Sequence, residues 1–227
     1  MIRSCMTILL LVLATILSPA LARESLPETT KDGLQLKHQT ELGAVYIRPG
    51  ASLEGYERIR LVDVYVAFAK DWKRDYNREQ MGVGRRITDD DMEKIKEKVA
   101  SEFKRVFTKE LTSGGYQVVD ENAADVMLLR PAIINLEVTA PDLPSVGMTR
   151  TIVRSTGSMT LYAELYDSVT SEKFAEVIDA EEVGGHSFAH EANRGTNQAE
   201  LDRTLASWAN ILRKRLDEAH QASAAGS

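Results

Sequence analysis

Two histidines four residues apart are the first candidates for chemistry in this sequence. His186 and His190 stand in GGHSFAHEAN, with Glu191 beside the second of them. On a helix, side chains four apart lie on one face, and two imidazoles placed there could share a zinc ion. However, no third ligand occurs at a diagnostic spacing, and Gly184 and Gly185 favour a loop. We therefore predict solvated loop histidines, with no bound metal and no cofactor.

Three further patterns suggest reactions, and each lacks a necessary component. Residues 82–86 (GVGRR) are rich in glycine but lack the Lys-Ser/Thr ending of a phosphate-binding loop. Asp179, Glu181 and Glu182 crowd a strand end, yet nothing nearby is expected to raise a carboxylate pKa as a glycosidase requires. No Gly-x-Ser-x-Gly pattern of a hydrolase nucleophile surrounds the candidate serines, which are Ser155, Ser158 and Ser187. We predict no catalytic residue.

Aromatic and basic side chains interleave between residues 70 and 78, in KDWKRDYNR. Such a surface can stack on sugar rings, bind carboxylates or anchor a partner protein. The alternative is that Trp72 folds back over the sheet edge while the charges stay in water. Arg150 and Arg154 could add positive charge. We predict a partner-binding loop composed of Lys70, Trp72, Lys73, Arg74, Tyr76 and Arg78.

The N-terminal residues carry a targeting signal. Arg3 precedes an apolar run at residues 8–17, and the small residues around Leu21 form a cleavage site, so we predict a signal peptide cut after Ala22. The single cysteine, Cys5, precedes the apolar run, so neither a lipid anchor nor a disulfide is expected. No segment is apolar over the ~20 residues that span a bilayer. We expect an exported protein that resides in the periplasm.

Composition and patterning divide the remaining chain into three parts. Residues 23–41 are polar and predict a flexible arm, residues 42–219 form one domain, and residues 220–227 form a disordered tail. The formal net charge of −6 argues against nucleic acid as a partner. The oligomeric state is left open by these patterns.

Hydrophobic periodicity predicts the elements of the domain. Strands are expected at 43–50, 56–69, 116–119, 124–139 and in a long hairpin at 157–179, and the polar residues 70–86 are expected to form a loop. Helical spacing covers 89–113, between a predicted cap at Thr88 and Gly114, and again 197–219. The order β-β-α-β-β-β-β-α predicts an α+β fold, in which a mixed or mainly antiparallel sheet packs two long helices on one face.

Four stretches together resemble the uncharacterised domain-of-unknown-function family 3313. They are GAVYIRPGASLEGYERIRLVDVYVAF, ADVMLLRPAIINLEV, GSMTLYAELYDSVTSEKFAEVID and LASWANILRKRLDE. The resemblance implies an exported bacterial envelope protein with no established reaction, and it transfers no catalytic residue. Many members are lipoproteins, which the position of Cys5 does not match. Such hairpins commonly turn with glycine where this chain has Ser171, so we expect a positive φ at that serine.

These observations favour a non-enzymatic envelope protein, a binding or assembly module whose loops engage another protein or peptidoglycan. A carrier of a small or lipid-like ligand, held between sheet and helices, is the first alternative. A hydrolase of unrecognised type is the second. A cavity in the core would favour the carrier, a buried Ser-His pair or facing carboxylates the hydrolase, and a flat aromatic patch the binding module.

Overall fold

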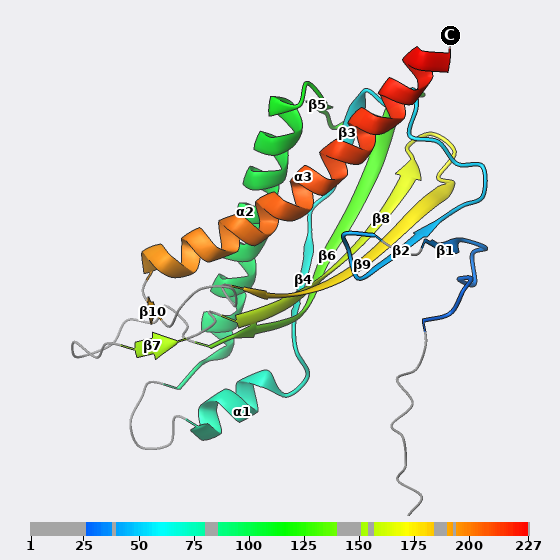
Figure 1. Cartoon of the computed structure of the whole chain (residues 1–227). Coiled ribbons are helices and arrows are strands. Elements are labelled where there is room, and N and C mark those ends of the chain that lie inside the picture. The colour runs from blue at the N-terminus through cyan, green and yellow to red at the C-terminus, as the bar shows by residue number, and fades with distance from the viewer. Residues whose placement is uncertain are drawn as a thin grey trace, which may run out of the picture.

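In the computed structural model, the described residues form a mixed eight-stranded β-sheet, a separate two-stranded sheet and three helices (Figure 1). The structure describes residues 26–37, 40–79, 86–139, 151–153, 157–183, 190–192 and 194–226. The helices are α1 (Trp72–Glu79), α2 (Asp89–Ser113) and α3 (Arg194–Gly226). The strands are β1 (Gln35–Lys37), β2 (Ala44–Ile47), β3 (Arg58–Leu61), β4 (Tyr65–Phe68), β5 (Gln117–Val118), β6 (Val126–Val138), β7 (Thr151–Val153), β8 (Gly157–Asp167), β9 (Lys173–Val183) and β10 (His190–Ala192).

Within the described residues, eight strands join in the order β1-β2-β9-β8-β6-β3-β5, and β4 also pairs with β6. The neighbouring strands β1, β2, β9, β8 and β6 pair antiparallel in that order. Strands β3 and β4, in contrast, both run parallel to β6. Strands β7 and β10 form a separate antiparallel pair. The predicted α+β class is therefore confirmed, and the long hairpin is β8–β9 at the centre of the sheet.

The two long helices share one apolar core with the sheet, and α3 crosses α2 in Figure 1. Alternation along β8 turns Leu161 and Leu165 towards the helices, where they join one apolar core with Phe103 of α2 and Leu205 of α3. Phe103 also stacks on Phe107, with ring centroids 3.9 Å apart. This core holds the helices on the sheet because it removes their apolar stripes from water.

Helix α2 begins and ends where the sequence predicts. The side chain of Thr88 accepts a hydrogen bond from the backbone of Asp91, and the Asp91 carboxylate accepts one from the Thr88 backbone, which completes a capping box. Gly114 caps the other end, and Gly115 follows with a φ of +94°.

The predicted strand at 56–69 is divided in two, and this division explains a proline in its neighbour. Strand β3 pairs with β6 up to Leu129, and β4 begins its pairing at Ala132. Pro131 lies between these positions, where β6 passes from one parallel partner to the other. A proline has no N–H to donate, so this gap accommodates it inside a strand.

Both ends of the predicted domain are more structured than the sequence suggested. The arm at 23–41, expected to be flexible, contributes β1 and buries Leu34 completely against Tyr46. Helix α3 continues through the predicted disordered tail to Gly226, and His220 stacks on Tyr116 with ring centroids 5.8 Å apart. Both corrections have one cause, namely apolar or aromatic side chains that find a partner in another element.

The turn of the β8–β9 hairpin is built around Asp167. Its carboxylate accepts hydrogen bonds from the backbone N–H groups of Val169 and Thr170, and the hydroxyl of Tyr56 donates to it at 2.9 Å. Burial, followed by this hydrogen bond, raises the pKa of Tyr56 to about 12. Ser171 has a φ of +60°, which confirms the positive φ expected at this position.

We expect Ser171→Gly to stabilise the protein. A non-glycine residue is strained in the left-handed region, and glycine relieves this strain at some cost in unfolded-state entropy. The free energy of unfolding should rise by roughly 0.5–1 kcal/mol. Urea denaturation followed by circular dichroism measures the change, and a lower denaturation midpoint for the variant would contradict the expectation.

Candidate functional site

An apolar cavity of about 420 Å³ lies between α3 and the sheet. Its floor is the helix-facing side of β8, β9 and β2, where Leu161, Ala163 and Leu165 alternate along β8. The next strands add Val177 and Val45. Small-molecule sites typically measure roughly 300–1,000 Å³, and this cavity falls within that range.

A β-bulge widens the apolar floor. The register of β8 and β9 shifts between Leu165 and Tyr166, which leaves Phe174 as an extra residue in β9. As a result Phe174 and its neighbour Ala175 both line the cavity, although successive strand residues normally face opposite sides. Phe174 is in turn held by Tyr56, with ring centroids 5.4 Å apart.

Helix α3 supplies the wall of the cavity. Trp208, Ile211 and Leu212 lie at the spacing of one helical face and turn towards the floor, and Phe107 of α2 closes the inner side. The polar side chains among the lining residues are Lys37, Thr40, Glu41, Ser52 and Arg215. They come from the end of β1, the segments beside β2 and the later part of α3, so polarity is confined to the ends and rim.

Asp179 holds the wall to the floor. This carboxylate is only 6% exposed, accepts a hydrogen bond of 2.7 Å from Nε1 of Trp208, and accepts a second of 2.7 Å from the backbone N–H of Gly43. It therefore joins β9, α3 and the residue before β2. The sequence predicted that Asp179, like Glu181 and Glu182, lies at a solvated acidic strand end. The structure shows instead that Asp179 is buried and holds α3 to the sheet.

The predicted partner-binding loop at 70–78 is mostly helix α1, which extends from the end of β4. Trp72 is 9% exposed and stacks on Phe68, with ring centroids 4.4 Å apart. Tyr76 packs beside Trp72 at 5.5 Å, and burial raises its pKa. The aromatic side chains thus cover the end of β4, as the alternative interpretation of Trp72 proposed.

Most basic side chains of this segment are matched by acids. Lys73 contacts Asp89 at 2.6 Å, and Arg74 contacts Asp75 at 2.9 Å and Asp71 at 3.2 Å. The hydrogen bond from Arg74 is the main reason that the pKa of Asp75 lies below its usual value. Arg78 lies 3.8 Å from the same Asp75, whereas Lys70 is exposed. The segment therefore presents little net positive charge, and its partner-binding role stays a prediction.

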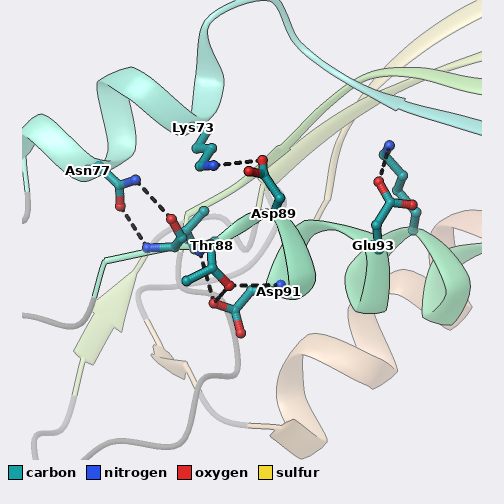
Figure 2. Close-up of polar contacts among 8 residues, drawn as sticks. Lys73, Asn77, Thr88, Asp89, Asp91 and Glu93 are labelled. Atoms are coloured by element: carbon teal, nitrogen blue, oxygen red, sulfur yellow. Dashed lines mark hydrogen bonds and ion pairs between the residues drawn. The ribbon is translucent and has the colours of Figure 1, made fainter.

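Figure 2 shows how α1 is fastened to the start of α2. The side chain of Asn77 accepts a hydrogen bond from the backbone N–H of Ile87 at 2.7 Å and donates one to its carbonyl oxygen at 3.0 Å. Lys73 reaches across to Asp89 in the first turn of α2 (Figure 2). These contacts lie directly before the capping box at Thr88, so they fix the position of α1 relative to α2.

A second charged cluster lies on the sheet face opposite to the helices. The ammonium of Lys173 contacts Glu164 at 2.7 Å, Asp32 at 2.8 Å and Glu176 at 3.2 Å. Burial opposes the charge on Lys173, but its hydrogen bonds to the three carboxylates outweigh burial and raise its pKa. The cluster ties the arm at Asp32 to the central hairpin, and we assign it a structural role.

Several residues singled out from the sequence lie outside the described part of the chain, namely His186, Gly82, Gly84, Ser155, Ser187, Arg150 and Arg154. Ser158 lies on β8, and its hydroxyl is 3.4 Å from the carboxylate of Glu137. Within the described residues, no group of three or more His, Cys, Asp or Glu side chains is arranged so that it could hold a metal ion, and no helix is long and apolar enough to cross a membrane.

The cavity was missed because its two sides are far apart in the sequence. Alternation does predict that Leu161, Ala163 and Leu165 share a face, and the helical stripe predicts that Trp208 and Leu212 do so. Only the distance between α3 and the sheet decides whether these faces touch or enclose a space. The small side chain of Ala163 at the centre of the floor is the available signal.

Comparisons with known proteins provide a family but no activity. Two dodecamer structures of PelC from Paraburkholderia phytofirmans, one of them a point variant, are 10% and 11% identical to this chain, with TM-scores of 0.39 and 0.35. Each alignment covers 74% of this chain. It covers 95% of the PelC chain in the point variant and 98% in the other structure. These TM-scores are too low to carry PelC's assembly over to this chain.

No curated protein is significantly similar to the chain. A family model described as "Protein of unknown function (DUF3313)" matches residues 28–212, which include every strand of the main sheet and most of α3. The match begins within the arm, at the residues that lead into β1. The four stretches that resemble this family lie inside the match, except for the last few residues of the fourth, and the chain belongs to the DUF3313 family.

Proposed function

We propose that the protein is an exported, non-enzymatic carrier of an apolar small molecule, which it holds in the cavity between α3 and the sheet. The cavity itself carries this proposal, because a protein of this size normally fills its core to the density of an organic crystal. A space of about 420 Å³ with an aliphatic floor is large enough for a ligand and offers it the apolar surroundings that favour burial.

The surroundings of the cavity support a carrier better than a hydrolase. The floor consists of aliphatic side chains and the ring of Phe174, and the polar groups stand at the rim. The buried carboxylate of Asp179 is occupied by two N–H donors, one of them from Trp208. The predicted signal peptide supports export to the periplasm. The chain's membership of the DUF3313 family, whose members resemble exported envelope proteins, supports it too.

A neutral fluorescent probe, N-phenyl-1-naphthylamine, tests this proposal. We expect saturable binding with a fluorescence increase, and a rise in melting temperature with probe concentration, since a ligand that binds only the folded state stabilises it. Ala175→Leu fills part of the floor and should weaken probe binding about tenfold, which corresponds to ~1.4 kcal/mol.

The matched control is Ala180→Leu on the same strand. Ala180 is exposed and lies on the opposite face of β9, so its variant should bind the probe as the parent does. Circular dichroism of both variants establishes that they are folded. The absence of saturable binding to the parent protein, or equal binding by both variants, would overturn the proposal.

A further inference from the structure

We infer that the ligand is an anionic amphiphile, whose alkyl chain lies on the floor of the cavity and whose head group meets Lys37 at the rim. This inference rests on the proposed function, because it specifies the chemistry of the molecule that the same cavity would hold. It depends on the dimensions of the floor, on the lack of hydrogen-bonding groups there, and on the charges at the rim.

The floor has the dimensions of an extended chain. Leu161 and Leu165 both line the cavity and are four residues apart on β8, which corresponds to about 13 Å at ~3.3 Å per residue. The floor also spans β8, β9 and β2, which are ~4.8 Å apart, so it is about 10 Å wide. A flexible hydrocarbon chain can adapt its conformation to this surface, so the ligand does not need a rigid shape that matches the cavity.

The floor also excludes polar ligand groups. Its side chains are aliphatic or aromatic, and the backbone groups of β8 are paired on both sides with β6 and β9. A sugar or a peptide placed here would lose its hydrogen bonds to water and gain none, which is unfavourable. The part of the ligand that lies on the floor should therefore be hydrocarbon.

The rim selects the charge of the head group. Its ionisable side chains are the cations Lys37 and Arg215 and a single acid, Glu41. Arg215 is engaged with Glu218 at 2.8 Å, whereas Lys37 is exposed and forms no ion pair among the described residues. Lys37 stands opposite Val45 in the β1–β2 register, and Val45 lines the cavity, so both side chains lie on the helix side of the sheet.

The test compares ligands that share one chain and differ in head group. Decanoate, decanol and decyltrimethylammonium, each below its micellar concentration, are titrated into the full mature chain by calorimetry. We expect decanoate to bind more tightly than decyltrimethylammonium. Lys37→Glu should lower the affinity for decanoate relative to that for decyltrimethylammonium by about fivefold or more, because it reverses the charge that the head group meets at the partly exposed rim. The affinity for lysophosphatidylglycerol, measured in the same way, shows whether the site accepts a phosphate head group in place of a carboxylate.

Two controls separate the inference from the proposed function. Lys31→Glu changes the same charge on an exposed arm residue that does not line the cavity, and should leave the affinity ratio unchanged. If all three decyl compounds bind equally to the parent and Lys37→Glu changes nothing, the charge inference is wrong while the carrier proposal stands. If decanol and decanoate both fail to bind, the carrier proposal itself is overturned.

Discussion

Replacing Trp72 by alanine is expected to lower the free energy of unfolding by about 3–4 kcal/mol. The indole is almost fully buried, stacks on Phe68 at the end of β4 and contacts Tyr76, so its removal leaves a cavity between α1 and the sheet. Large-to-small substitutions of buried aromatic residues typically cost about this much. Urea denaturation followed by circular dichroism and by intrinsic fluorescence measures the loss.

The same variant decides whether the aromatic residues of α1 belong to the core or bind a partner. Arg74→Ala removes an exposed side chain of the same helix and should change stability by less than about 0.5 kcal/mol. If Trp72→Ala keeps the stability of the parent and loses capture of a crosslinked envelope protein, then Trp72 is a binding anchor and its burial contributes little to the fold.

Replacing Asp179 by alanine is the second large change, with an expected loss of about 3 kcal/mol. The substitution leaves the N–H groups of Trp208 and Gly43 buried without their acceptor, and hydrogen bonds to a charged group contribute about 1.5–3 kcal/mol each. The cost of burying the carboxylate offsets part of this sum. Thermal and urea denaturation measure the difference between the variant and the parent.

Two companion variants make the Asp179 result specific. Asp179→Asn keeps one acceptor oxygen and places an NH₂ group against a donor, so we expect it to lose about half as much stability as the alanine variant. Glu182→Ala removes an exposed carboxylate from the same strand and should be nearly neutral. A loss below 1 kcal/mol for Asp179→Ala would show that α3 is held to the sheet without this anchor.

Local signals were sufficient to predict the long elements. Thr88 and Gly114 delimit α2, and the alternation along β8 gives the central hairpin, because each signal depends on neighbours within one element. Helix α1 was predicted as a loop because it is short and polar. Its helical state depends on Trp72 packing on Phe68 and on Asn77 binding Ile87, which are contacts between elements. The spacing of Trp72 and Tyr76 is the only local sign of it.

The remaining differences have the same origin. Leu34 is one of three leucines in the polar segment 23–41, and its complete burial depends on Tyr46 and on the ion pair between Asp32 and Lys173. Asp179 is an acidic residue in an acidic segment, and its contacts with Trp208 of α3 and with Gly43 distinguish it from its neighbours. Contacts of this kind connect positions more than 100 residues apart or join separate elements, and periodicity carries no information about them.

The outer strands of the sheet have a consequence for how the protein behaves at high concentration. In the described part of the chain, the outermost strands of the main sheet are β1 with three residues and β5 with two, and β4, with four residues and an irregular register, also has an unpaired side. The separate pair of β7 and β10 consists of strands of only three residues each. Long, regular unpaired strands template addition of strands from other molecules, which leads to aggregation. These short strands offer few free N–H and C=O groups in register, so the sheet is poorly suited to nucleating fibrils in a crowded compartment.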